Sequence, residues 1–329
     1  MADIGSDIQT LAGLLVLIGL YVLANFGERS RTPRILTLVA GGLLSGLALG
    51  AAILLAAGQA LQYGLGKVTA GQLRAAEVIA AFLALGGVLG LLYLAPPVRR
   101  AVSRVLPLRA DSPLGYITLV ISTLFFAGQV GSQVAVNVLE VLKNGAPLSP
   151  TDLLLQDIPF LVLAFVGVGL FVRRPLGDTL QRLGLRPPPA PYWWLVALLA
   201  IPVFMGVAYG IEAIARVVTP NTVKQVNDVS TLLFSRFNNP AAILFLGVVA
   251  GIVEEVLFRG ALVPRLGIVL TAVLFAALHT QYGITFASLE VFVLGVGLGW
   301  LRIRSGTLTC IVAHAGYDIA VGLVSLFAR

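Results

Sequence analysis

The sequence is poor in charge and in cysteine. Of its 329 residues only 11% are charged while 58% are hydrophobic, and the mean hydropathy is +0.97. A soluble domain needs far more charged surface than this, so a soluble protein is excluded. The single cysteine, Cys310, lies in an apolar run, which excludes an internal disulfide and offers no thiol-protease dyad of known geometry.

The N-terminus also lacks a basic region before the first apolar run. A cleaved signal peptide begins with positive charge, so we interpret this run as a retained helix. Apolar runs of membrane-spanning length then recur to the C-terminus, which predicts an all-α polytopic membrane protein whose main partner is the lipid bilayer. We predict ten spans, near residues 11–26, 35–59, 75–95, 114–142, 157–172, 192–215, 241–264, 266–281, 284–301 and 307–327.

Basic residues account for the net charge of +7, but they are spread over short loops, which is typical of orientation signals and not of nucleic-acid binding. Most arginines follow the first, third, fifth, seventh and ninth spans. We call this end of the helices the Arg-rich side. By the positive-inside rule it faces the cytoplasm and both termini lie outside. The sequence thus predicts a multi-pass protein of the cell membrane, such as a bacterial inner membrane.

A basic, proline-rich linker at 173–191 indicates two parts. Residues 1–175 form an N-terminal transmembrane region of about five helices that carries no recognised motif. Residues 180–329 form a C-terminal helical bundle that carries the scarce ionisable residues. The stretch 219–240 is interpreted as the longest polar loop on the outer side.

Two adjacent glutamates and an arginine interrupt the seventh span. Glu255 and Arg259 are four residues apart and meet on one helix face, where they would form a supporting ion pair. Glu254 is rotated by roughly 100° and is left to face a water-filled cavity. Ionisable groups are costly in hydrocarbon, so an unpaired one indicates function. A purely structural pair is the alternative, but it leaves Glu254 without a partner.

The only two histidines, His279 and His314, lie in later apolar segments. We count residues from the Arg-rich side at about 1.5 Å per helical residue, with a turn placed at Arg265. Glu254 then lies roughly 16 Å from that side, His279 roughly 20 Å and His314 roughly 15 Å. Three helices therefore bring their polar groups to a common depth near the middle of the membrane. We predict an active site at this depth that is reached from the Arg-rich side.

Asp318 lies four residues after His314, on the same helix face, where it can orient the imidazole or take part directly. Phe275 lies one turn before His279 and is expected to pack against it.

A carboxylate and an imidazole can activate water for attack on a carbonyl, and a second imidazole can stabilise the oxyanion. Two histidines and a glutamate could alternatively hold Zn²⁺, but no HExxH motif is present, so no metal or other cofactor is predicted.

At these residues the sequence resembles the CAAX protease and bacteriocin-processing (CPBP, or ABI) family of intramembrane proteases. The motifs are Glu254-Glu255-Val256-Leu257-Phe258-Arg259, then Phe275-Ala276-Ala277-Leu278-His279, then His314-Ala315-Gly316-Tyr317-Asp318. The segment Arg182-Leu183-Gly184-Leu185-Arg186 is similar to the approach to the first motif. The resemblance covers residues 180–329 and implies a glutamate-dependent endopeptidase that needs no metal.

The resemblance implies that Glu254 is the general base, aided by His279, and that Glu255 and Arg259 hold the site together. It also implies that His314 and residue 318 form the oxyanion site. Asp318 departs from the asparagine of eukaryotic relatives, and an ionised aspartate cannot donate to an oxyanion, so its role shifts toward orienting His314.

The implied reaction is cleavage of a peptide bond in a membrane-associated protein or peptide, either by CAAX-type C-terminal trimming or by processing of a bacteriocin or leader peptide. Two other functions stay open. One is a non-catalytic immunity or binding scaffold of the same fold. The other is a proton-coupled transporter, in which Glu140, Glu212 and Glu290 would serve as a relay. The sequence carries no signal for the oligomeric state.

Overall fold

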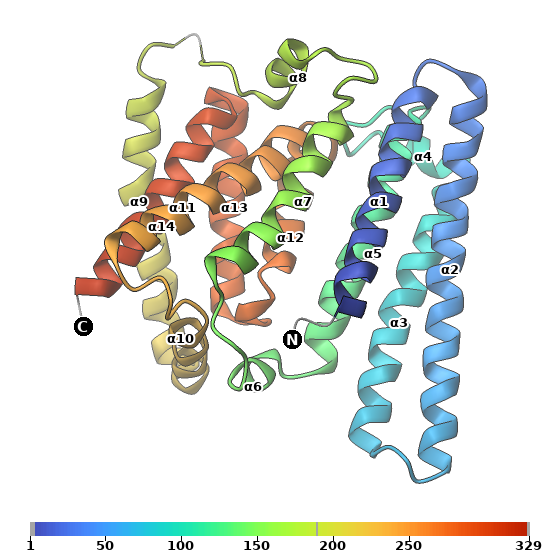
Figure 1. The fold of residues 1–329 in the computed structure, drawn as a ribbon, viewed down its shortest axis with the longest axis horizontal. Coiled ribbons are helices and arrows are strands. Elements are labelled where there is room, and N and C mark those ends of the chain that lie inside the picture. Colours follow the sequence, from blue (N-terminus) through green and yellow to red (C-terminus); the bar gives the residue numbers. More distant parts are fainter. Residues whose placement is uncertain (1–3, 189, 328–329) are drawn as a thin grey trace.

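The computed structural model describes residues 4–188 and 190–327, and over these ranges its regular elements are helices, with one isolated bridge between Leu170 and Arg174. The chain is thus an all-α polytopic membrane protein (Figure 1). The first part contains α1 (Ile4–Gly27), α2 (Arg31–Gly64), α3 (Ala70–Leu92), α4 (Pro96–Val102), α5 (Pro113–Ala135), α6 (Val138–Leu142), α7 (Pro150–Val168) and α8 (Leu176–Leu183). The second contains α9 (Trp193–Val218), α10 (Pro220–Leu233), α11 (Pro240–Glu255), the π-helix η1 (Val256–Leu262), α12 (Val263–Leu278), the short 3₁₀ turn η2 (Thr280–Tyr282), α13 (Phe286–Ser305) and α14 (Thr307–Phe327).

The described residues contain eight helical runs that are long and apolar enough to cross a membrane, together with a shorter apolar segment, Leu11–Gly27. One of these runs, Pro240–Leu278, contains both the seventh and the eighth predicted spans. The backbone leaves the helical conformation between them at Gly267, with φ +74° and ψ 176°, so the turn predicted near Arg265 is present. The fourth predicted span is shorter than expected, because α5 ends at Ala135 before α6 begins.

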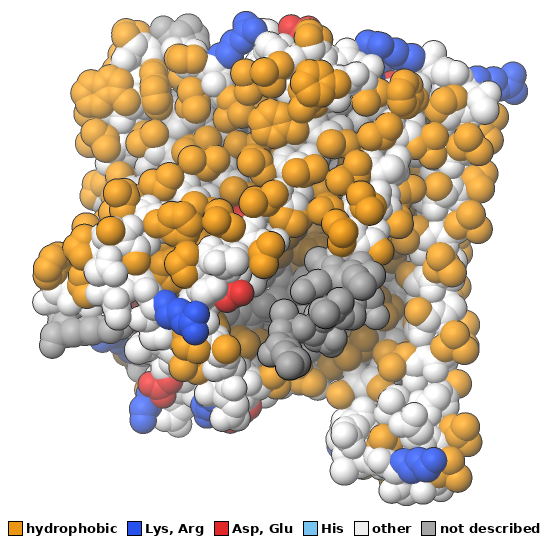
Figure 2. Space-filling view, in the orientation of Figure 1, with side chains coloured by type: hydrophobic (Ala, Val, Ile, Leu, Met, Phe, Trp, Pro, Cys, Tyr) orange, Lys and Arg blue, Asp and Glu red, His pale blue; other side chains and the backbone are white. Residues whose placement is uncertain are grey.

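The surface of the bundle is apolar over most of its height. Large aliphatic side chains such as Leu47, Leu54 and Val217 are more than two-thirds exposed. Figure 2 shows hydrophobic side chains over the face in view, with lysine and arginine gathered near its upper and lower edges. A soluble protein would not expose so much apolar area, whereas a lipid bilayer covers it without cost.

The helices run back and forth between two ends of the molecule. In Figure 1, α4 and α8 lie at the upper end and α6 and α10 at the lower end. The upper end is the Arg-rich side, because α4 and α8 carry arginines that follow the third and fifth spans. This alternation fits the predicted up-and-down topology, although which membrane the protein occupies stays a prediction.

Two polar segments that we interpreted as irregular contain helices. The predicted outer loop at 219–240 holds α10, and the proline-rich linker holds α8 before its proline run begins. Helix α10 is amphipathic, with Val226 and Val229 buried on the face that meets the bundle. Its apolar residues recur every three positions, which is a helical period that the many asparagine, aspartate and proline residues nearby obscure.

Small residues bring α11 and α14 into close contact. A side-chain carbon at Gly251 would lie 2.9 Å from the backbone nitrogen of Ala315, and one at Gly247 would lie 3.1 Å from the Ala315 carbonyl oxygen. Only glycine permits so close an approach of two helix backbones. Because Gly251 and Ala315 are near neighbours of Glu254 and His314 in the sequence, this contact sets the separation between the acidic motif and the second histidine.

Candidate active site

The glutamate motif lies where α11 gives way to the π-helix η1. Glu255 is the last residue of α11, and its Oε1 accepts a 2.6 Å hydrogen bond from Nη1 of Arg259. Both side chains are almost fully buried, with 0% and 1% of their surface exposed. The ion pair expected from the four-residue spacing is therefore formed, and the widened helical turn between the two residues does not disrupt it.

The π-helix is fixed from outside by arginines. A π turn departs from regular α-helical hydrogen bonding, so its carbonyl groups are available to other donors. Three successive backbone carbonyl groups of η1 accept hydrogen bonds of 2.8 to 3.1 Å from arginine side chains. The carbonyl of Arg259 accepts from Arg302, the carbonyl of Gly260 from Arg182, and the carbonyl of Ala261 from Arg265. The sequence indicated Arg302 as an orientation signal, Arg265 as the position of a turn and Arg182 as part of the approach to the first motif, but it gave no sign that all three would bond to this π-helix.

Arg259 and Phe275 connect the ion pair to the rest of the core. The Cζ atom of Arg259 lies 4.3 Å from the centroid of the Phe275 ring, and its Nη2 donates to the carbonyl oxygen of Gly295 at 3.2 Å. The ring of Phe275 also meets the rings of His279 and His314 edge-on, with centroids 4.7 and 5.9 Å apart. Phe275 thus separates the two histidines and holds the guanidinium against an aromatic face.

His314 is the centre of the polar cluster. Its Nδ1 donates to Oε1 of Glu255 at 2.8 Å, and the same oxygen accepts from Arg259. Its Nε2 is directed toward two further carboxylates, 3.5 Å from Oδ2 of Asp318 and 3.9 Å from Oε2 of Glu254. A carboxylate bonded to one ring nitrogen fixes the orientation of an imidazole, so the buried Glu255 aims Nε2 at the remaining acidic groups.

Glu254 faces a cavity of about 1000 Å³. Its side chain is only 16% exposed, and its Oε2 has no hydrogen-bond partner among the described residues. A buried carboxylate oxygen without a partner is costly unless something binds there. The same cavity is lined by His279, His314 and Asp318, so the structure brings all four residues predicted as catalytic to one space.

We expected His279 to lie inside a helix. The structure instead places it at the C-cap of α12, with φ −80° and ψ 59°. Its Nδ1 lies 2.8 Å from the carbonyl oxygen of Phe275. Since a carbonyl only accepts, Nδ1 carries the hydrogen, and a neutral ring keeps a lone pair on Nε2. His279 therefore presents a proton acceptor at the cavity wall.

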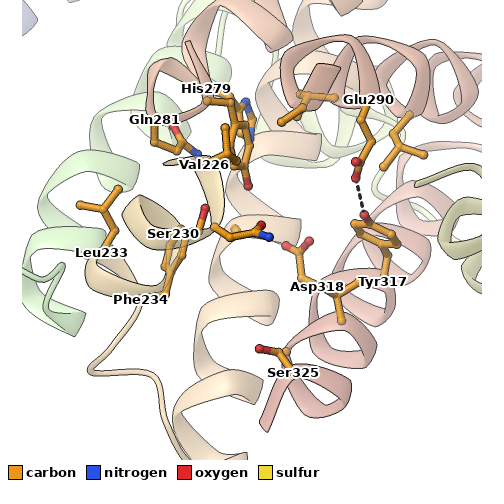
Figure 3. Close-up of a pocket in the computed structure, with 18 of the residues that line it drawn as sticks. Val226, Ser230, Leu233, Phe234, His279, Gln281, Glu290, Tyr317, Asp318 and Ser325 are labelled. Carbon is orange, nitrogen blue, oxygen red and sulfur yellow. Dashed lines mark hydrogen bonds between the residues drawn. The ribbon is translucent and has the colours of Figure 1, made fainter. Parts of the chain in front are cut away.

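The cavity lies between the C-terminal motifs and the lower end of the bundle. Figure 3 shows Val226 and Ser230 of α10 across the cavity from Asp318, and Glu290 joined to Tyr317. That hydrogen bond, from the Tyr317 hydroxyl to the Glu290 carboxylate, measures 2.9 Å. Two other acidic residues that we considered for a proton relay form ion pairs with exposed partners, Glu140 with Lys143 and Glu212 with Arg216.

The cavity walls come from several helices. They include α10, the segment 280–287, the first half of α7 and the last turns of α14, together with parts of α9, α11 and α13. Of these, α10 lies at the end of the bundle opposite α4 and α8 (Figure 1). The predicted approach from the Arg-rich side stays a prediction.

One acidic residue of the cavity was missed. Asp157, in α7, lines the cavity together with Glu254 and is 7% exposed. We had found no catalytic cluster before residue 175, because Asp157 stands alone in an apolar span without a motif. The division into parts at 1–175 and 180–329 stays a prediction, but α7 of the first part packs against α11 and η1 of the second.

The two histidines and the acidic residues do not form a metal-ligand cluster. Among the described residues, no three histidine, cysteine, aspartate or glutamate side chains converge as a metal ion requires. One ring nitrogen of each histidine already has a protein partner, since Nδ1 of His279 bonds to a carbonyl and Nδ1 of His314 to Glu255. That the site works without a metal stays a prediction.

The fold and the site together define a polytopic membrane protein with buried carboxylates and imidazoles around an intramembrane cavity. Residues 236–320 match the family model described as Type II CAAX prenyl endopeptidase Rce1-like. The chain therefore carries an Rce1-like domain, which confirms the family resemblance indicated by its three motifs. The matched range contains Glu254, His279, His314 and Asp318, whereas Asp157 and the segment 182–186 precede it. Comparison with curated proteins and with solved structures found no match.

Proposed function

We propose that this protein is an intramembrane endopeptidase in which Glu254 activates the attacking water. The observation that carries the proposal is the Oε2 atom of Glu254, which is buried at the wall of a cavity and has no hydrogen-bond partner in the described part of the chain. His314, 3.9 Å away, is itself held by the buried pair of Glu255 and Arg259. The Rce1-like domain supports endopeptidase activity in general.

In the proposed reaction, a water molecule binds between Glu254 and the substrate carbonyl. Glu254 takes one proton from the water while the oxygen attacks the carbonyl carbon, which forms a tetrahedral oxyanion. The C–N bond then breaks, and the proton held by Glu254 passes to the departing amine. The products are a carboxyl and an amino terminus, and Glu254 returns to its ionised form. No metal ion is assigned a role in these steps.

The two histidines have different roles in this proposal. The free lone pair on Nε2 of His279 helps to hold the water for Glu254. A protonated His314 directs Nε2–H toward the oxyanion, because Nδ1 is already occupied by Glu255. Asp318, 3.5 Å from the same Nε2, favours the protonated ring and orients it. An ionised Asp318 is therefore compatible with the site even though it cannot donate to the oxyanion itself.

The proposed substrate is a segment of a membrane-associated protein or peptide that reaches the cavity lined by α10. CAAX-type trimming of a C-terminus and processing of a bacteriocin or leader peptide both remain within this proposal. Because α10 and the segment 280–287 line the cavity, we propose that the substrate enters at that end, which is the non-cytoplasmic side if the Arg-rich side faces the cytoplasm. The side of approach therefore bears directly on which substrates are available.

A comparison of new chain termini in membranes tests the proposal. Cells would express either the wild-type protein or its Glu254→Gln variant at equal abundance, and termini would be quantified across the membrane proteome. We expect a set of termini that occurs only with the wild type, and their positions would separate C-terminal trimming from processing within a span. Coinciding profiles under several growth conditions would contradict the proposal and favour a non-catalytic binding or immunity scaffold.

A further inference from the structure

Asp157 is a buried carboxylate that the proposed reaction does not use. Its side chain lies in α7, outside the three motifs, and it is 7% exposed at the wall of the cavity. Its Oδ2 atom has no hydrogen-bond partner in the parts of the chain at 4–188 and 190–327. A carboxylate in this position needs a proton or a cation, because its desolvation is otherwise uncompensated.

The cavity around Asp157 is acidic, although the chain as a whole carries a net charge of +7. Among the described residues it is lined by five carboxylates, Asp157, Glu212, Glu254, Glu290 and Asp318, and by one arginine, Arg216. Arg216 does not neutralise the interior, because it is 65% exposed and pairs with Glu212 at 2.8 Å. Even with His314 protonated, the five carboxylates outnumber the cationic groups at the cavity wall, so the cavity favours a ligand that brings positive charge.

The other carboxylates already have partners. Glu290 accepts the hydroxyl hydrogen of Tyr317, and Asp318 faces Nε2 of His314. Asp157 and Glu254 are left as the two buried acids at the cavity wall that each have an oxygen without a hydrogen-bond partner among the described residues. A bound cation would offset the cost of burying these carboxylates.

We propose that Asp157 binds a cationic nitrogen of the substrate and so selects peptides whose segment within the cavity carries a positive charge. The inference rests on the proposed function, which it deepens by naming the substrate class. The nitrogen belongs either to a lysine side chain or to a free N-terminal amine, since an ammonium group has the same three donors in both. Asp157 is thus a specificity-determining residue supplied by the part of the chain outside the Rce1-like match.

Binding of synthetic peptides tests this inference without relying on cleavage. The purified full-length Glu254→Gln variant in detergent would be titrated with three fluorescent apolar peptides of one sequence. One carries a central lysine and an acetylated N-terminus, one a central norleucine and an acetylated N-terminus, and one a central norleucine and a free amine. We expect one of the two cationic peptides to bind at least about 10-fold more tightly than the neutral peptide, and the tighter one identifies the source of the nitrogen.

Second substitutions in the same background assign the preference to one carboxylate. Asp157→Asn keeps the shape and removes the charge, so the preference should disappear, whereas Asp157→Glu keeps the charge and should retain part of it. Asp228→Asn is the matched control, because Asp228 is exposed on α10 and does not line the cavity. The control should bind all three peptides as the parent does.

The outcomes separate this inference from the proposed function. Equal binding of the cationic and neutral peptides would overturn the role of Asp157, even if cleavage that depends on Glu254 is found in membranes. A preference that persists in Asp157→Asn would overturn it as well. If Asp157→Asn abolishes the binding preference but no cleavage is found, the result would support the cation site and contradict the proposed protease function.

Discussion

The imidazole Nδ1 of His314 lies 2.8 Å from Oε1 of Glu255, although 59 residues separate the two in the sequence. Glu255 has no exposed surface, so this hydrogen bond is made in a nearly dry environment. It links α11 to α14 and simultaneously sets the direction of the second imidazole nitrogen. The residue next to the proposed base therefore acts through His314 and not on the substrate.

The buried pair of Glu255 and Arg259 is expected to stabilise the fold strongly only while both partners are present. Replacing Arg259 with Met leaves Glu255 charged and buried, and we expect a loss of about 3–5 kcal/mol in the free energy of unfolding. Unfolding in detergent would be measured for Glu255→Gln, Arg259→Met and the double variant. The double variant should be more stable than the sum of the single losses implies, and strict additivity would contradict a direct pair.

Asparagine substitutions separate structure from chemistry at the two histidines. An asparagine amide can replace the Nδ1 donor to Glu255 or to the Phe275 carbonyl, but it has no group in place of Nε2. We expect His314→Asn and His279→Asn to unfold near the wild-type temperature and to lose about 10²–10⁴-fold in cleavage rate.

His314→Ala provides the contrast, because it also loses the hydrogen bond to Glu255. This variant should be less stable by about 1–3 kcal/mol. Equal stability of His314→Ala and His314→Asn would show that the contact with Glu255 contributes little.

Asp318→Asn tests the departure from the pattern of eukaryotic relatives. In the structure Asp318 faces Nε2 of His314 at 3.5 Å, a position from which an asparagine amide could donate to the oxyanion directly. We expect Asp318→Asn to keep activity within about tenfold of the wild type and Asp318→Ala to fall well below both. A loss in Asp318→Asn as large as that in Asp318→Ala would mean that the negative charge is essential.

Chemical labelling from each side of the membrane tests where the cavity opens. Cys310 is buried and provides little background, so single cysteines can be placed at exposed positions. Asn221→Cys at the start of α10 and Ala101→Cys in α4 should react with an impermeant maleimide from opposite sides, in intact and inverted vesicles respectively. Reaction of both from one side would contradict the arrangement, in which the cavity lies away from the arginine loops.

Helix geometry and short motifs predicted the parts of the site that lie within single helices. The spacing of Glu255 and Arg259 fixes their pairing on one helix face, and the match over 236–320 confirms the family indicated by the motifs. The common depth of Glu254 and His314 also follows from counting along helices, because rise per residue is nearly constant. These features need no knowledge of how distant segments pack.

The features that the sequence did not predict depend on tertiary contacts. Asp157 joins the site only because α7 packs against α11, and nothing adjacent to it in the sequence indicates this. Nothing in the sequence indicates that Arg182 and Arg302 would donate to backbone carbonyls of η1. For α10, the three-residue recurrence of valine would have been a usable signal.

The most direct test of the account is the cleavage rate of Glu254→Gln on a substrate identified from the membrane termini. Purified wild-type and variant proteins would be compared in the same detergent, with Asp228→Asn as a control for loss of an acidic group outside the cavity. The account predicts that Glu254→Gln keeps the wild-type unfolding temperature and loses at least about 10²-fold in rate, while Asp228→Asn cleaves normally. A folded Glu254→Gln protein that cleaves at the wild-type rate would contradict the assignment of Glu254 as the base.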